Sequence, residues 1–161
     1  MMIFVNKIFI PSVILVIVFL AVNSAQAGSG SKIEPIDEAS LNKLITADDN
    51  YMVLSFMAAW CGPCIDELPA LNRLYKRYKD RGLQIIGISI DFAGPAAMQP
   101  VVEKLKIDFP VYWSGEKAIN KFKLNAIPML LFIRNGEMVE RLHGRRPEEF
   151  LDQKIREYLE E

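Results

Sequence analysis

The pattern of apolar residues changes along this chain: some segments have the pattern of a β-strand and others the spacing of an α-helix. The runs 51–57 and 83–90 are almost wholly apolar, which is typical of central strands covered on both faces. Between them, residues 62–79 place apolar side chains at near-helical spacing, and Gly82 stands where a glycine often ends a helix. A strand, a helix and a second strand joined by short links predict a right-handed parallel crossover.

The remaining pattern predicts further helices and a hairpin. Asn135-Gly136 separates two apolar runs, which is a strong hairpin signal, and a short extended piece precedes it at 109–113. We expect Pro100 to kink one further helix, Ser114 to cap another and Pro147 to open the last. The order predicts an α/β fold with a mixed central sheet flanked by helices. The predicted helices cover 40–47, 94–106, 114–122 and 147–159, and the hairpin strands cover 129–134 and 138–142.

The N-terminal segment differs in composition from the rest. Lys7 precedes the uncharged stretch 8–22, and the tripeptide Ala25-Gln26-Ala27 follows it. A positive start, a short apolar stretch and an Ala-x-Ala end describe a secretory signal, although an uncleaved anchor stays open because the apolar run could extend further back. We expect residues 1–27 to be a signal peptide or membrane anchor, 28–32 a flexible Gly-Ser tether and 33–161 one domain.

Composition and charge narrow the range of functions. Apolar residues make up 51% of the 161-residue chain, which is enough for a packed core. The 19 basic and 20 acidic residues give a net charge of −1, so there is no electrostatic case for nucleic-acid binding.

The chain has two cysteines, Cys61 and Cys64, and they stand at the start of a predicted helix. The unpaired N–H groups and the positive dipole end of a helix N-terminus favour thiolate over thiol, and thiolate is the reactive form. C-x-x-C beside a β-α-β pattern is a redox motif. We therefore predict that Cys61 is a nucleophile and that Cys64, one turn later, resolves the mixed disulfide that Cys61 forms.

Three other interpretations of the cysteine pair compete with this one. Half of a zinc site is disfavoured, because the chain offers two cysteines and one histidine, His143, where a structural zinc needs four ligands. A purely structural disulfide would close too short a loop to stabilise much. Inert buried thiols fit poorly with the Gly-Pro dipeptide between the cysteines and the helix that follows them. No metal and no cofactor are expected.

With these elements in place, the sequence resembles the thioredoxin superfamily. The motifs are Trp60-Cys61-Gly62-Pro63-Cys64 and, before the hairpin, Ile127-Pro128. The continuation to Glu67 and Pro69 gives C-x-x-C-x-x-E-x-P, which resembles the TlpA/ResA-like branch of exported thiol–disulfide oxidoreductases. The resemblance implies a thioredoxin fold with an insertion after the first β-α-β unit, at 91–113 in this chain.

The resemblance also implies roles for particular residues. Pro128 would be a cis-proline opposite the C-x-x-C, and the substrate-binding residues would be Trp60, Gly62, Pro63, Ile127 and Pro128. Ser55 stands where cytosolic thioredoxins have a buried aspartate that accepts a proton. In the TlpA/ResA-like branch a helix glutamate takes that part, and Glu67 matches its position. Glu67 also lies three residues after Cys64, so both should share one helix face. Asp91, at a strand end, is interpreted as a cap for the loop that follows.

The expected function is reduction of protein disulfides outside the cytosol through a Cys61/Cys64 dithiol. The resemblance adds apocytochrome c as a candidate substrate, a membrane electron-donor protein as partner, and a periplasmic or otherwise extracytoplasmic place, secreted or anchored to the inner membrane. Three alternatives stay open: a disulfide oxidase or isomerase, a peroxidase, and a non-catalytic peptide-binding module. A peroxidase is disfavoured because the chain lacks a Thr-x-x-Cys site.

Overall fold

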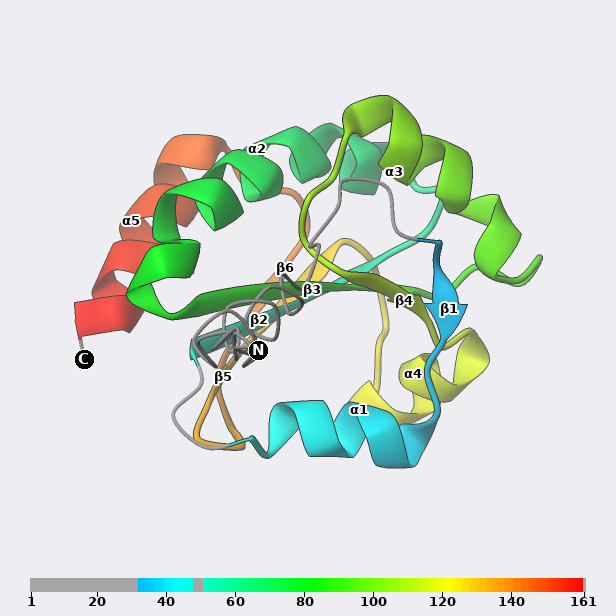
Figure 1. The fold of residues 1–161 in the computed structure, drawn as a ribbon, viewed down its shortest axis with the longest axis horizontal. Coiled ribbons are helices and arrows are strands. Elements are labelled where there is room, and N and C mark those ends of the chain that lie inside the picture. The colour runs from blue at the N-terminus through cyan, green and yellow to red at the C-terminus, as the bar shows by residue number, and fades with distance from the viewer. Residues whose placement is uncertain (1–31, 48–50, 161) are drawn as a thin grey trace, which may run out of the picture.

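The computed structural model describes residues 32–47 and 51–160, which form a six-stranded mixed sheet between two layers of helices (Figure 1). The strand order is β1-β4-β3-β2-β5-β6. β2 (Tyr51–Met57), β3 (Leu83–Ser89), β4 (Val111–Trp113) and β1 (Glu34–Pro35) run parallel to one another. β5 (Met129–Arg134) and β6 (Glu137–His143) add an antiparallel hairpin. The predicted mixed α/β sheet and the parallel crossover are therefore confirmed.

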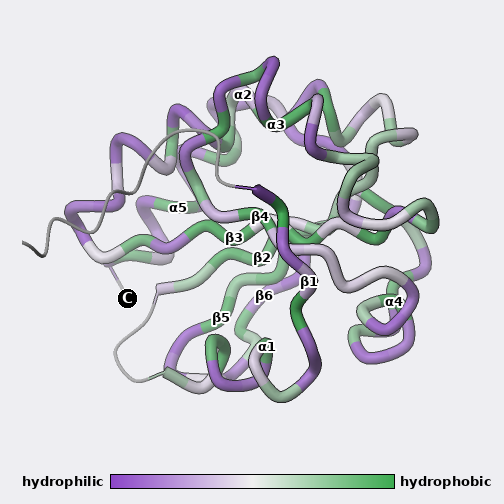
Figure 2. Tube along the Cα trace, turned by 45° about the vertical axis from the view of Figure 1, so that its right-hand side comes forward, coloured by the Kyte–Doolittle hydropathy of each residue, from purple (hydrophilic) through white to green (hydrophobic). Residues whose placement is uncertain are grey.

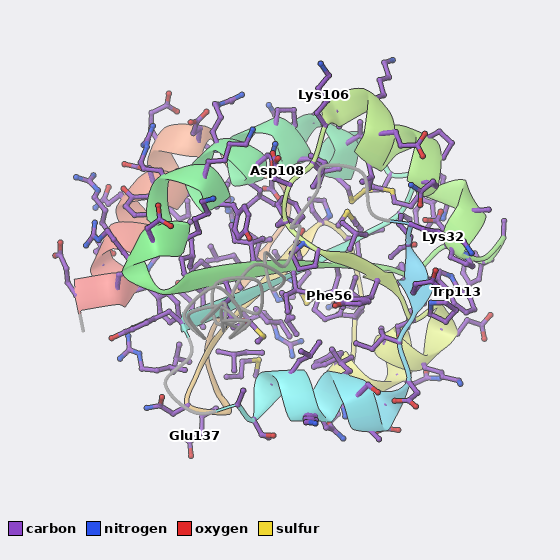
Figure 3. All side chains as sticks on the ribbon, viewed as in Figure 1. Lys32, Phe56, Lys106, Asp108, Trp113 and Glu137 are labelled. Atoms are coloured by element: carbon purple, nitrogen blue, oxygen red, sulfur yellow. A yellow bond between two sulfur atoms is a disulfide. The ribbon has the colours of Figure 1, made fainter. Side chains whose placement is uncertain are left out.

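Helices cover both faces of this sheet. α2 (Gly62–Tyr78), α3 (Gln99–Leu105) and α5 (Glu148–Glu160) lie on one face, and α1 (Glu38–Ile45) and α4 (Glu116–Phe122) lie on the other (Figure 1). Apolar positions concentrate on the strands, and polar positions line the outer sides of the helices (Figure 2). Phe56, which is fully buried, lies near the centre of the molecule (Figure 3). Burial of such strands on both sides explains their nearly unbroken apolar sequence.

Three local predictions were wrong. Pro100 does not kink a helix, because it stands in the first turn of α3, where its missing N–H costs nothing. The residues before α3 form a separate 3₁₀ turn, Pro95–Ala97. Ser114 does not cap α4: it is buried, its N–H bonds to the carbonyl of Ser89, and Gly115 takes the capping position.

The first helix and the first strand also differ from the prediction. α1 begins at Glu38 rather than at residue 40, because the Asp37 carboxylate accepts the Ser40 N–H as an N-cap. β1 has two residues and pairs with β4, and its sequence carries no strand pattern.

The described residues contain no helix long and apolar enough to span a bilayer. The predicted signal peptide or anchor, 1–27, and most of the tether lie outside the described residues.

Candidate functional site

The cysteine pair lies where β2 ends and α2 begins. Cys61 and Cys64 form a disulfide with their Cα atoms 5.3 Å apart. Cys61 is the N-cap of α2, and its Sγ atom accepts the Cys64 N–H at 3.3 Å. Pro63 stands in the first turn, where a residue without an N–H fits best. The sulfur of Cys61 thus faces the N–H groups and positive dipole end that favour a thiolate.

The residues before and between the two cysteines in the sequence are exposed to solvent. Trp60 is 61% exposed, and Gly62 and Pro63 are exposed as well. Cys61 is 5% and Cys64 2% exposed, so Cys61 is the more accessible residue of the two. That Cys61 meets the substrate and Cys64 acts second stays a prediction.

Glu67 lies one turn beyond Cys64 on α2 and is buried, with 2% of its surface exposed. Its Oε1 atom accepts the backbone N–H of Arg146 at 2.8 Å, and its Oε2 atom has no hydrogen-bond partner among the described residues. Burial raises the pKa of this carboxyl, while the Arg146 N–H and the charges of Arg145 and Arg146 oppose the rise. A carboxyl with a raised pKa and one free oxygen is suited to taking up a proton.

Ser55 lies in β2, between Gly87 of β3 and Leu130 of β5, and is buried. It offers a hydroxyl and no carboxylate at this position. In the part of the chain that the structure describes, the buried carboxylates are those of Glu67 and Asp91.

The Ile127–Pro128 peptide bond is cis, as the resemblance implies. It directly precedes β5, whose first residue, Met129, pairs with Phe56 near the end of β2. The pairing brings the cis-proline to the edge of the sheet from which the Cys61 loop emerges. The carbonyl of Pro128 accepts the Gly144 N–H at 2.8 Å, so the segment after β6 supports both the cis-proline and Glu67.

An apolar pocket of about 340 Å³ adjoins these residues. Trp60 and Ile127 line it from the two halves of the site, and Phe92, which is 67% exposed, lines it from the insertion. Large exposed apolar side chains that share one pocket mark a binding surface. Sequence reasoning missed Phe92, because a single phenylalanine in a loop carries no periodic signal. The remaining lining residues are Ile90, Ile119, Leu124, Asn125 and Ala126.

Asp91 was interpreted as a cap for the following loop, and that interpretation was incomplete. Its carboxylate is 1% exposed and accepts the Ala59 N–H, at 3.0 Å on Oδ1 and 3.1 Å on Oδ2. The Ser89 hydroxyl donates to Oδ2 at 2.8 Å. Asp91 therefore contacts the loop that carries Trp60 and Cys61, which its sequence position gives no reason to expect.

The described residues contain no group of three or more His, Cys, Asp or Glu side chains that could hold a metal ion. His143 ends β6 and is exposed. The chemistry available at this site is that of the cysteine pair and the carboxyl beside it.

The fold and the cysteine pair are those of the thioredoxin-like class, with a redox disulfide at the start of a helix and a cis-proline opposite. The chain belongs to the AhpC/TSA family, whose sequence profile matches residues 30–141.

Named relatives agree with this class. The chain is 33% identical to thiol-disulfide oxidoreductase ResA of Bacillus cereus over 101 residues, which cover 62% of this chain and 58% of the relative. It is 28% identical to ResA of Oceanobacillus iheyensis over 113 residues, 69% of this chain and 58% of the relative. The matched part therefore spans less than two thirds of these relatives' length.

Solved structures share the fold. A Chlorobium tepidum protein assigned as thiol:disulfide interchange protein DsbE superposes with a TM-score of 0.66 at 26% identity, covering 73% of this chain and 84% of that one. StoA from Bacillus subtilis superposes with a TM-score of 0.60 at 19% identity, covering 68% and 84%. These similarities confirm the resemblance to the TlpA/ResA-like branch and the thioredoxin fold.

Proposed function

We propose that this protein is an extracytoplasmic thiol–disulfide oxidoreductase that reduces disulfides of protein substrates through Cys61 and Cys64. The observation that carries the proposal is the pair's position at the N-terminus of α2, with the buried Glu67 one turn behind it. The ResA names of the relatives and the Gly-Pro dipeptide between the cysteines support the reducing direction.

The reaction has two exchange steps. In the first, the Cys61 thiolate attacks one sulfur of the substrate disulfide, forms a mixed disulfide and releases one substrate thiolate. In the second, Cys64 passes its proton to Glu67, attacks the Cys61 sulfur and expels the second substrate thiolate. The substrate gains two electrons, the Cys61–Cys64 disulfide forms, and the proton on Glu67 leaves to solvent or to the released thiolate. A membrane dithiol protein would return two electrons to the pair.

The residues around the cysteine pair also suggest which kind of protein substrate would bind: an extended segment with a large apolar side chain. We infer that an extended segment pairs with the backbone at Ile127, as in β-augmentation, beside the cis-proline. A large apolar side chain next to the substrate cysteine then enters the pocket between Trp60 and Phe92. Apocytochrome c before haem attachment is one substrate that the family resemblance suggests.

A trapping experiment tests the proposal. The variant Cys64→Ser keeps the attacking thiol and removes the resolving one, so mixed disulfides with substrate should accumulate and disappear on adding dithiothreitol. The matched control Cys61→Ser removes the attacking thiol and should form none. Equal trapping by both variants would show that Cys61 is not the nucleophile.

Each alternative function predicts a different result, in the trapping experiment or in one further assay. An isomerase would be trapped by Cys64→Ser in the same way, because it too attacks a substrate disulfide, but it would rearrange disulfides without a net loss of them. An oxidase would give the opposite net reaction: the wild-type Cys61–Cys64 disulfide would be reduced as a substrate dithiol is oxidised. A peroxidase would consume hydrogen peroxide at a rate that depends on Cys61. A non-catalytic peptide-binding module would bind peptide equally well in the wild type and in Cys61→Ser, with no exchange activity in either.

A further inference from the structure

The loop between β2 and α2 is held at its middle by a buried carboxylate. The loop begins at Ala58, and the Cys61 N–H closes a turn onto the Ala58 carbonyl at 3.0 Å. Within that turn the Ala59 N–H points to Asp91 and bonds both of its carboxylate oxygens. The short turn that joins the end of β2 to the reactive sulfur is therefore anchored to Asp91 at Ala59.

Asp91 is itself held from several sides. The Ser89 hydroxyl donates to Oδ2 at 2.8 Å and accepts the Asp91 N–H at 3.3 Å. The Asp91 carbonyl accepts the indole N–H of Trp113 at 2.7 Å. Trp113 lies at the β1–β4 side of the sheet (Figure 3), so the contact reaches the strand at which the insertion ends. These bonds fix the direction in which the carboxylate meets the Ala59 N–H.

A carboxylate in this place is an unusual choice for stability alone. It is 1% exposed, and among the described residues no Lys, Arg or His side chain forms an ion pair with it. Burying a carboxylate without a cation is costly, and a backbone carbonyl or a neutral side chain could accept one N–H at lower cost. The side chain of Asp91 brings an acceptor to the Ala59 N–H that the Ser89 hydroxyl holds in place, and this positioning depends on an oxygen at that place rather than on the charge.

We propose that Asp91 is a positioning residue for Cys61: it fixes the Ala58–Trp60 turn so that the Cys61 sulfur stays at the N-cap of α2. At the N-cap the sulfur accepts the Cys64 N–H and lies at the positive end of the helix. Release of the Ala59 N–H would let the turn rotate and move the sulfur away from that position. The thiolate of the reduced protein would then lose the stabilisation that makes it reactive. This inference rests on the proposed role of Cys61 as the attacking thiol.

Alkylation of the reduced protein tests the inference without any protein substrate. The rate of reaction of Cys61 with iodoacetamide is measured from about pH 5 to about pH 10 in the full chain, along with the melting temperature. Asp91→Ala should shift the alkylation midpoint upward and slow the reaction near pH 6 by at least about tenfold, because an unassisted thiol titrates at about 8.5, above the range of roughly 3.5–7.5 found for thiols at helix N-termini. Asp91→Asn keeps an oxygen for the Ala59 N–H and should stay within about threefold of the wild-type rate, on the same thiolate argument.

The control variants distinguish a role of Asp91 in positioning Cys61 from a role in stability alone. Asp37→Ala also deletes a carboxylate that accepts a backbone N–H, but it lies at α1, on the face of the sheet opposite α2 (Figure 1), and should leave the alkylation profile unchanged. An unchanged profile in Asp91→Ala with a lower melting temperature would reduce Asp91 to a structural residue and overturn the proposal. A downward shift of the midpoint would overturn it too, because the buried charge would then be opposing the thiolate.

Two further outcomes are decisive. If Asp91→Ala does not fold, Ser89→Ala must slow alkylation in the same direction, because it deletes the hydroxyl that donates to Oδ2 and accepts the Asp91 N–H. An unchanged rate counts against the proposal. If wild-type Cys61 reacts like an ordinary cysteine, with a midpoint near about 8.5, the proposed nucleophile itself is wrong. If wild-type Cys61 is activated but Asp91→Ala leaves its alkylation profile unchanged, only the positioning role of Asp91 is contradicted.

Discussion

The backbone N–H of Arg146 donates a hydrogen bond to Oε1 of Glu67 at 2.8 Å, across 79 residues of sequence. The bond holds one oxygen of a buried carboxyl and leaves the other without a partner among the described residues. The Gly144 N–H, two residues earlier, bonds the carbonyl of the cis-proline. One short segment after β6 thus connects the proposed proton acceptor with the proposed substrate-binding strand.

Glu67→Gln should slow the second exchange step and leave the first nearly unchanged. The amide cannot accept the Cys64 proton, and a positioned general base contributes about 10²-fold or more. Stopped-flow measurement with a disulfide peptide should therefore show mixed disulfide forming at the wild-type rate and resolving about 10²-fold more slowly. The pH profile of resolution in the wild type should show a limb above the ordinary glutamate range, because burial raises the pKa of Glu67.

The neighbouring Asp66→Asn is the matched control, since Asp66 is an exposed carboxylate on the same helix. It should resolve the mixed disulfide at the wild-type rate. A Glu67→Gln variant that resolves equally fast, with the same pH limb, would remove Glu67 from the mechanism.

The free energy of unfolding should also depend on whether Glu67 is protonated. Its pKa is raised in the folded protein, so the folded state holds a proton that the unfolded chain releases at ordinary glutamate pH. The resulting stabilisation is fully present below about 4.3, the pKa of an unperturbed glutamate, and is lost as the pH rises through the folded value. Glu67→Gln should therefore show a shallower decline in the free energy of unfolding as the pH rises above about 4.3. Parallel changes in the urea-derived free energies of both proteins across that range would contradict the buried, titrating carboxyl.

Phe92→Ala should change substrate preference rather than exchange chemistry. The pocket loses one exposed apolar wall, and burial of a large apolar side chain stabilises by about 1.5–3 kcal/mol. The preference for a disulfide peptide with leucine beside its cysteine over one with glycine should fall by about tenfold, mainly through KM. Reduction of a small disulfide that does not reach the pocket should be unaffected.

Val139→Ala provides the comparison, because Val139 is 51% exposed on β6 and does not line this pocket. An equal loss of preference in both variants would show that the effect is not specific to the pocket.

Tyr158→Phe should destabilise the fold without touching the redox site. The Tyr158 hydroxyl accepts the Met52 N–H of β2 at 3.0 Å and donates to the Ile133 carbonyl of β5. Its removal leaves a buried N–H without a partner, which costs about 1–3 kcal/mol in the free energy of unfolding. Tyr75→Phe deletes a hydroxyl that has no hydrogen-bond partner among the described residues, so chemical denaturation should show a much smaller change.

The same tyrosine predicts a loss of stability in alkali. Burial raises the pKa of Tyr158 to about 12 in the folded protein, against about 10 for an unperturbed tyrosine. The contribution of the protonated hydroxyl is therefore complete below about pH 10 and declines as the pH approaches about 12. Tyr158→Phe should lack this decline, which denaturation at several alkaline pH values measures.

The elements that could be predicted are those whose signals are local. The apolar runs of β2 and β3, the Asn135-Gly136 turn and the cysteines at the start of α2 each depend on neighbouring residues. The cis bond at Pro128 depended on resemblance, because no local pattern separates it from a trans proline. Pro100 was misread since a proline in the first turn of a helix looks, in sequence, like one in its middle.

The features that could not be predicted depend on contacts between distant parts of the chain. β1 has two residues and exists only because β4 offers a parallel partner. The bond from Arg146 to Glu67 uses a backbone N–H, which every non-proline residue carries. The bond from Ala59 to Asp91 spans 32 residues and joins two loops. Such contacts leave no periodicity in the sequence.

The most direct test of the account is the equilibrium reduction potential of the Cys61–Cys64 pair, measured in thiol–disulfide buffers near neutral pH. The account predicts a single two-electron transition at or below about −250 mV, near the value of thioredoxin, as a reductase requires. A potential near about −120 mV, the value of a strong disulfide donor, would contradict the proposed direction of electron flow.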